Sequence, residues 1–83
     1  MTSSRIRKTV LDVLRGLAPE TADAEIEPET PFIEQFDLDS MDFLRLMEGL
    51  ERALGIAIRD LDYPRLSTLR GCEEYLSMKV AAA

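Results

Sequence analysis

Ser40, which stands between Asp39 and Asp42 in the stretch FDLDSMDFLRLMEGL (residues 36–50), is the position at which this sequence could do chemistry. We expect Asp39 to cap a helix and Asp42 to complete a capping-box pattern, which makes Ser40 the first helical residue. Its hydroxyl would lie beside backbone N–H groups that lack intrahelical partners, where the helix dipole favours negative charge. A phosphoester on that oxygen would be stabilised there. Taken alone, the four residues DSMD are more simply a solvated helix start.

The composition argues against catalysis by the chain itself. Its 83 residues predict a single domain (1–83, with an ordered core of about 5–77), which leaves little room for an enclosed catalytic cleft. There is no histidine, and Cys72 is the single cysteine. The commonest general base, a disulfide and a Cys/His zinc cluster are therefore excluded, and we expect neither an enzyme nor a metal site.

The charge distribution predicts the kind of partner. The net charge is −6, and the acids concentrate in residues 20–62, whereas residues 1–17 are mainly basic. An acidic surface of this extent repels nucleic acid and anionic lipid and steers toward basic proteins. Residues 1–14 contain no continuous apolar stretch, so we expect no signal peptide and no membrane span. The sequence thus predicts a cytoplasmic protein that binds neither nucleic acid nor membrane.

Helical spacing of apolar residues predicts two of the main elements. The first helix begins near Ser3 or Ser4, either of which can cap it, and ends at Ala18, before Pro19. Residues 19–38 are expected to form a long loop, a kind of segment that usually has a function or a partner. The strongest helical pattern runs over residues 39–54 and is followed by Gly55, a suitable C-terminal cap. The apolar residues expected to pin the long loop onto the core are Ile26, Phe32, Ile33 and Phe36.

The remaining chain predicts one short and one long helix. Ile56 and Ile58 alternate like a brief extended piece, and residues 59–66 suggest a short helix or turn. Ser67 or Thr68 can cap a last helix that ends at about Ser77, with a frayed VAAA tail. We therefore predict an all-α fold, a small antiparallel bundle of three longer helices plus one short helix.

A helical wheel divides the helix at 39–54 into two faces. Met41 falls on the predicted solvent face, so an apolar side chain is expected to be exposed one residue after Ser40. The predicted buried arc holds Phe43, Leu44, Leu46, Met47, Leu50 and Leu54. The opposite side holds Asp42, Arg45, Glu48, Gly49 and Arg52.

The stretch FDLDSMDFLRLMEGLERALGIAI resembles the central motif of acyl carrier proteins, in which Asp-Ser-Leu or Asp-Ser-Met opens the second helix of a four-helix bundle. The resemblance extends over roughly residues 5–77. It includes the charged first helix, the ETPFIEQF lead-in to the motif, and LSTLRGCEEYL, which is similar to the family's last helix.

This resemblance implies that Ser40 receives a 4′-phosphopantetheine arm from coenzyme A, added by a separate Mg²⁺-dependent phosphopantetheinyl transferase. The terminal thiol of the arm would carry an acyl or aminoacyl group as a thioester. A long tether lets one substrate visit several active sites at high effective concentration. The implied partners are a loading ligase and a downstream synthase or transferase, and the chain is a carrier.

Residues for partner recognition carry over in part from the family. Asp39 matches the acid before the modified serine, Met41 the apolar position after it, and Asp42 the acid that follows. Glu48 and Glu51 lie further along the same helix and are candidate salt-bridge positions for basic partners. Rim charges of this kind mainly set association rate and partner choice.

Two positions depart from the pattern of fatty-acid carriers. Arg45 stands where those carriers usually have an acid, with Arg52 further along the exposed side, and Asp37 replaces the usual glycine two residues before Asp39. These departures favour a specialised carrier that serves a dedicated ligase or synthase over a carrier of housekeeping fatty-acid synthesis.

Other interpretations stay open. An unmodified helical adaptor of the same fold, acting only through protein binding, is the main alternative, and an enzyme lacks a visible nucleophile and base. A calcium loop fails because Met41 and Asp42 occupy positions that need an acid or amide and a glycine. Cys72 is expected to be a buried hydrophobe rather than a nucleophile. Core residues that could also line an acyl cleft are Phe43, Leu46, Met47, Ile58 and Leu66.

Overall fold

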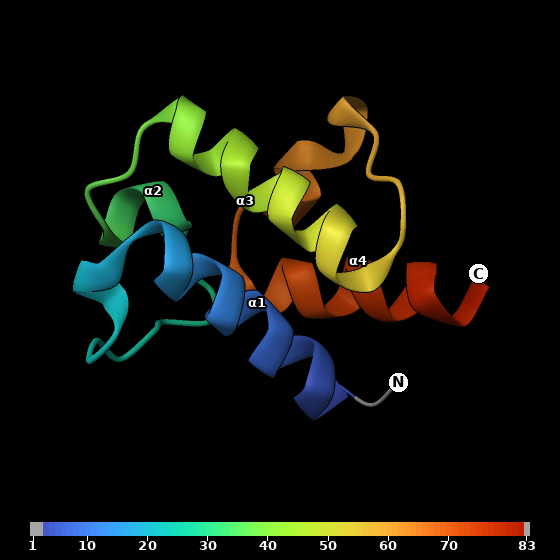
Figure 1. Cartoon of the computed structure of the whole chain (residues 1–83), viewed down its shortest axis with the longest axis horizontal. Coiled ribbons are helices and arrows are strands. Elements are labelled where there is room, and N and C mark those ends of the chain that lie inside the picture. Colours follow the sequence, from blue (N-terminus) through green and yellow to red (C-terminus); the bar gives the residue numbers. More distant parts are fainter. Residues whose placement is uncertain (1–2, 83) are drawn as a thin grey trace.

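Three long helices carry the fold, and the regular structure of the described residues is entirely helical. The computed structural model describes residues 3–82. In chain order its elements are α1 (Ser3–Leu17), η1 (Pro19–Thr21), α2 (Phe32–Gln35), α3 (Ser40–Leu54), η2 (Asp60–Leu66) and α4 (Leu69–Ala82). Figure 1 shows α3 running beside α1, with η2 leading the chain from the end of α3 back to the start of α4. The predicted all-α bundle is confirmed, and η2 is its short helix.

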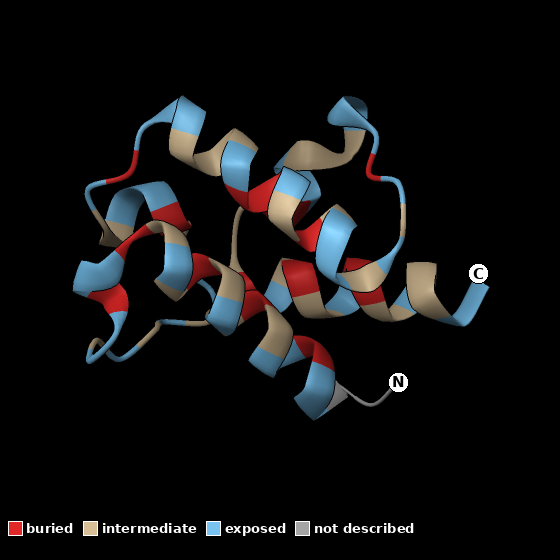
Figure 2. Ribbon diagram, viewed as in Figure 1, coloured by how far each residue is buried: buried red, intermediate tan, exposed pale blue. Residues whose placement is uncertain are grey.

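The core lies where the apolar stripes of α1, α3 and α4 meet. Ile6, Val10 and Leu14 recur every four residues on α1 and are at most 1% exposed, because this spacing places them on one face. The red segments of the three helices in Figure 2 face one another across the interior. The buried residues of the other two helices are Leu46, Met47, Leu50, Leu69, Cys72, Tyr75 and Leu76.

Gly49 corrects the helical wheel. The wheel placed it on the solvent face of α3, but a Cβ added there would come within 2.5 Å of the Val13 side chain. The absence of a side chain therefore lets α3 cross close to α1 at this point. A wheel gives the direction of a side chain and not the distance to the next helix, which is why the prediction for Gly49 was wrong.

The long connection between α1 and α3 is anchored to the junction of η2 and α4 by two backbone hydrogen bonds. The backbone N–H of Phe32 donates to Ser67 O at 2.9 Å, and that of Arg70 donates to Pro28 O at 2.9 Å. The predicted loop is correct in extent, but it contains the short helical turns η1 and α2. Phe32 is fully buried, as predicted, whereas Ile33 is 48% exposed and does not pin the loop to the core.

Gln35 organises the same connection from within. Its side-chain oxygen accepts from the Glu27 N–H at 2.9 Å, and its amide nitrogen donates to Glu27 O at 2.9 Å and to Thr30 O at 2.7 Å. One side chain thus replaces three of the backbone partners that regular structure would supply. The loop reaches α3 with a defined path for this reason.

The last helix begins as predicted and ends later. Thr68 caps α4, since its hydroxyl oxygen accepts from the Gly71 N–H at 3.0 Å. The helix continues to Ala82, so the predicted end at about Ser77 was wrong; Ala83 lies outside the described residues. Alanine has the highest helix propensity, and Lys79 is seated 5.7 Å from the centre of the Tyr75 ring, both of which favour the extra turn.

The start of the first helix is only partly covered by the structure. α1 already includes Ser3, so the residue in the capping position lies outside the described residues, and the predicted serine cap stays untested. The predicted end is confirmed, since α1 stops at Leu17 and buried Ala18 follows. Among residues 3–82 there is no helix with the length and apolar character that crossing a membrane requires.

Candidate functional site

Ser40 is held at the start of α3 by a reciprocal pair of hydrogen bonds. Asp39 has extended backbone angles and is the N-cap; its side chain accepts from the Asp42 N–H at 2.9 Å. The Asp42 carboxylate accepts in turn from the Asp39 N–H at 3.3 Å. The predicted capping box and the position of Ser40 as first helical residue are both confirmed. The serine hydroxyl is consequently not needed for capping.

The environment of Ser40 suits a negatively charged substituent. Ser40 is exposed, and it lies in the first turn of a 15-residue helix, where backbone N–H groups have no intrahelical acceptor. The positive end of the helix dipole lies at the same place. A phosphodiester on the Ser40 oxygen would meet both effects, while Asp39 and Asp42 use their own carboxylates on each other's backbone.

An apolar groove of about 500 Å³ opens directly beside Ser40. It lies between the start of α2, the first turns of α3 and the end of η2. Its surface is almost wholly apolar, and the two serines are its most polar side chains. The lining residues are Pro31, Ile33, Ser40, Met41, Phe43, Leu44, Tyr63, Pro64 and Ser67.

The wall of the groove on the η2 side includes an aromatic contact. The rings of Phe43 and Tyr63 meet edge to face with centroids 6.0 Å apart. Partial burial, followed by the nearby carboxylates of Glu51, Asp60 and Glu48, raises the pKa of Tyr63. The Tyr63 phenol therefore stays neutral at physiological pH.

Behind this wall, η2 is fastened to α4. The Tyr75 hydroxyl donates to the Asp62 carboxylate at 2.7 Å, and burial together with this bond raises the pKa of Tyr75 to about 12. The Cys72 thiol donates to Leu66 O at 3.3 Å. A Cβ on Gly71 would collide with Arg65 O, so glycine permits the close approach of η2 to α4. These contacts hold η2, and with it this side of the groove, in a fixed position against α4.

The groove is not made of the core residues named as cleft candidates. Of those five, Phe43 alone lines it. Leu46, Met47 and Leu66 are fully buried and Ile58 is 6% exposed, so their predicted core role is confirmed. The interior of the bundle is filled by these side chains, and the open apolar space lies at its edge.

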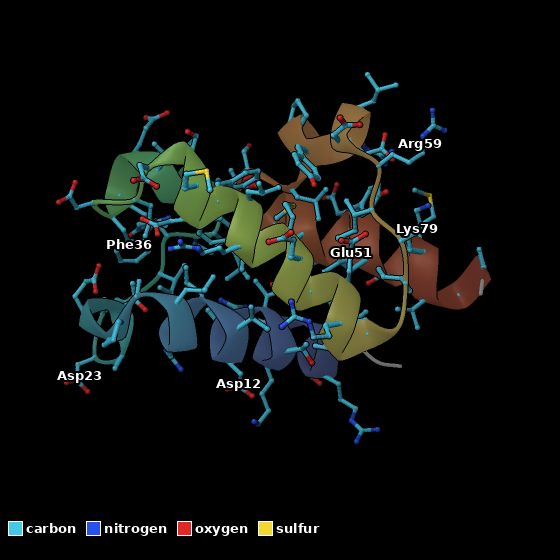
Figure 3. All side chains as sticks on the ribbon, turned by 45° about the horizontal axis from the view of Figure 1, so that its top comes forward. Asp12, Asp23, Phe36, Glu51, Arg59 and Lys79 are labelled. Atoms are coloured by element: carbon cyan, nitrogen blue, oxygen red, sulfur yellow. The ribbon has the colours of Figure 1, made fainter. Side chains whose placement is uncertain are left out.

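The residues proposed for partner recognition differ in their exposure and in whether their side chains already bond within the chain. Met41 is 55% exposed, as predicted, and borders the groove. Glu48 is exposed on α3. Glu51, by contrast, accepts a hydrogen bond from the Ile58 N–H at 2.8 Å, and Figure 3 shows it reaching from α3 toward the segment that leads to η2. Glu51 therefore supports the fold as well as any partner contact.

Two other candidate chemistries can be placed. Cys72 is fully buried, and burial raises its pKa to about 12, so the prediction of an unreactive hydrophobe is confirmed. In the part of the chain that the structure describes, no three Asp, Glu or Cys side chains gather to hold a metal ion.

Sequence reasoning missed several groove residues, of which Ile33 and Leu44 are the clearest. Ile33 was assigned to the core and Leu44 to the buried arc, yet both line the groove. The adjacent pair Phe32 and Ile33 could have indicated that one of the two side chains lies outside the core, because adjacent residues of a short helix cannot both face the same core.

Comparison with known proteins agrees with this geometry. A family model described as a phosphopantetheine attachment site matches residues 4–76. The chain is 29% identical over 75 residues to an acyl carrier protein of Nitratidesulfovibrio vulgaris, covering 90% of this chain and 92% of the relative. It is 29% identical over 79 residues to one of Chlorobium phaeobacteroides, covering 95% and 100%. It is 33% identical over 78 residues to one of Thermosynechococcus vestitus, covering 94% and 90%.

Proposed function

Because this chain belongs to the acyl carrier protein family and its cofactor is 4′-phosphopantetheine, we propose that the cofactor is attached to Ser40. The observation that carries the proposal is an exposed hydroxyl on the first residue of α3, at the head of an apolar groove. Ser40 combines an exposed hydroxyl, first-turn N–H groups and an adjoining apolar groove at one position. The chain is a carrier protein, and its partner enzymes perform the chemistry.

The residues present fit the cofactor. The first turn of α3 favours the charge of a phosphodiester, and the capping box fixes the backbone that presents Ser40. When bound, the cofactor supplies a thiol that holds an acyl or aminoacyl group as a thioester. Met41, Phe43 and Tyr63 offer apolar surface beside the attachment point and limit the access of water on that side.

The exposed side of α3 is the proposed contact surface for partners. These partners are a phosphopantetheinyl transferase, a loading ligase and a downstream synthase or transferase. Met41 would enter a partner's apolar pocket, because it is exposed next to Ser40. The residues proposed for recognition are Asp39, Met41, Asp42, Glu48 and Glu51.

We further propose a specialised pathway, with the chain acting as a monomeric single domain in the cytoplasm. Arg45 supports the specialised role, since its exposed guanidinium lies on α3 and pairs with Asp42 at 3.7 Å. Asp37 adds a second exposed charge before the attachment site. An enzyme built for an acidic carrier helix would meet a different charge pattern here.

Intact-protein mass spectrometry tests the attachment. The chain is incubated with coenzyme A, Mg²⁺ and a broad-specificity phosphopantetheinyl transferase, beside Ser40→Ala and the matched control Ser67→Ala, which removes the other groove serine. We expect the wild type and Ser67→Ala to gain one phosphopantetheine unit and Ser40→Ala to gain none. A gain on Ser40→Ala would move the site elsewhere, and no gain by any folded variant would favour the unmodified adaptor.

A further inference from the structure

On the exposed side of α3, the residues that follow Ser40 are apolar, basic, acidic and basic in turn. Met41, Arg45, Glu48 and Arg52 follow one another at spacings of four, three and four residues, which places them on one stripe of the helix. All four are exposed. We call this set the α3 stripe.

Acids near the stripe are largely committed within the chain. The Asp42 carboxylate serves the capping box and also lies 3.7 Å from the Arg45 guanidinium. Glu51 is bound to the Ile58 N–H. Glu48 is the one acid of the α3 stripe. Unlike those of Asp42 and Glu51, its carboxylate makes no ion pair within 4.0 Å and accepts no hydrogen bond among the described residues.

The two arginines are available to a partner. The Arg45 side chain is 60% exposed, and its contact with Asp42 at 3.7 Å is too long for a bidentate pair. Arg52 is exposed and makes no ion pair within 4.0 Å with residues 3–82. A guanidinium presents a planar fork of donors that matches a carboxylate, so these positions are suited to acidic side chains.

The net charge of the chain and the charges of the α3 stripe favour different kinds of partner. The net charge of −6 attracts basic proteins at long range, but the stripe itself holds two cations and one anion. Salt screens the long-range part, whereas close pairs set the register of a docked complex. A partner selected at close range must therefore differ from one selected by net charge alone.

We propose that the α3 stripe selects partner proteins whose docking surface places carboxylates opposite Arg45 and Arg52 and a basic side chain opposite Glu48, with an apolar pocket for Met41. The proposal rests on the proposed function, since it takes α3 as the helix that partners contact. A docking surface lined only by Lys and Arg is disfavoured, because it brings like charges together at two of the three charged positions.

The test measures binding and does not need the cofactor. The probe is a fatty-acid condensing enzyme that docks carriers through Lys and Arg side chains, used beside a version in which two of those side chains are Glu. Both are titrated against the Ser40→Ala chain by fluorescence anisotropy, with Arg45→Glu/Arg52→Glu added in one variant and Arg59→Glu in another. Arg59 is also exposed and lies outside α3, so Arg59→Glu controls for reversing the charge of an exposed arginine, with half of the four-unit charge change of the stripe variant.

We expect the chain to bind the Glu-bearing enzyme more tightly than its parent by about tenfold. Arg45→Glu/Arg52→Glu should reverse this preference, and Arg59→Glu should leave it unchanged. Equal effects of Arg59→Glu and the stripe variant, or a preference of the unchanged stripe for the basic parent, would overturn the proposal. Since no variant in this test can be modified at Ser40, the result is independent of the attachment assay.

Discussion

The first turn of α3 and the middle of the same helix are stabilised by different means. At the first turn, Asp39 and Asp42 are held by hydrogen bonds at the surface, and the adjoining side chains border an open groove. In the middle, Leu46 and Leu50 are fully buried, and Gly49 is in close contact with α1. One rigid helix thus joins a solvent-facing attachment point to the hydrophobic core.

This difference teaches that presentation and stability are separable in this fold. Buried apolar contacts in the middle dominate the free energy of unfolding, while the first turn contributes a cap and little buried area. Substitutions at one end should therefore alter modification or docking without unfolding the chain. Substitutions in the middle of α3 should lower the free energy of unfolding without removing any side chain of the first turn.

The largest expected effect comes from emptying the middle of α3. Leu50→Ala should lower the free energy of unfolding by about 2–5 kcal/mol, because Leu50 is fully buried and its removal leaves a cavity. Leu61→Ala is the matched control, since Leu61 is 76% exposed, and it should change stability by less than about 0.5 kcal/mol. Urea denaturation followed by circular dichroism measures both, and equal losses would contradict the packing described.

The groove wall provides the next largest effect. Tyr75→Phe should cost about 1.5–3 kcal/mol, because it removes the hydrogen bond to the Asp62 carboxylate and leaves that group without its partner. Tyr63→Phe is the control, since no described residue hydrogen-bonds its hydroxyl. Thermal denaturation at neutral pH compares the two, and a more destabilising Tyr63→Phe would contradict the proposed role of Tyr75.

The same tyrosine predicts a pH dependence. A folded-state pKa of about 12, above the ordinary value of 10.0, means that the folded chain holds this proton more tightly than the unfolded chain. The stabilisation is complete below pH 10 and is lost as the pH rises toward 12. Stability of the wild type should therefore fall more steeply over this range than that of Tyr75→Phe, and parallel curves would count against it.

A smaller effect is expected at the first turn. Asp39→Ala should cost about 1 kcal/mol by removing the N-cap of α3. Asp37→Ala removes an exposed aspartate that takes no part in the capping box, and should be nearly neutral. Chemical denaturation of the two variants measures the difference, and indistinguishable midpoints would show that the cap contributes nothing to stability.

The smallest effect concerns charge at the same end of α3. Glu34, Asp37, Asp39 and Asp42 are acids close in sequence to Ser40, and their repulsion should be relieved by added salt or Mg²⁺. We expect the melting temperature to rise by a few degrees, less than the shift of about 4–8 °C that accompanies 1 kcal/mol in a domain of this size. Asp37→Asn should reduce the rise. A melting temperature that ignores both salts would argue against self-repulsion.

Local features of the fold could be predicted from the sequence. The capping box of Asp39 and Asp42, the left-handed Gly55 with a φ of 66° and the Thr68 cap all follow from preferences within a few residues. The position of Ser40 follows from the first of these. Helix boundaries set by such caps were accordingly close to those observed.

Features that depend on distant contacts could not be predicted in the same way. The groove is made where three consecutive elements, α2, α3 and η2, pack together, and the spacing within α3 alone does not reveal Ile33 or Pro64 as its neighbours. The sequence suggests that Glu51 is a surface acid, because it does not show that the Ile58 N–H donates a hydrogen bond to its carboxylate. The closeness of Gly49 to Val13 depends on where two helices cross, which no single-helix pattern specifies.

The burial of Cys72 has a practical consequence for handling this protein. A thiol with a pKa of about 12, closed off beneath η2, reacts very slowly with disulfide reagents or alkylating agents while the chain is folded. It is also the single cysteine of the sequence, so a tethered thioester meets no accessible cysteine thiol on its own carrier. A colorimetric thiol count on the native protein would therefore read zero before attachment of the arm and one after it, with no need to mutate the cysteine.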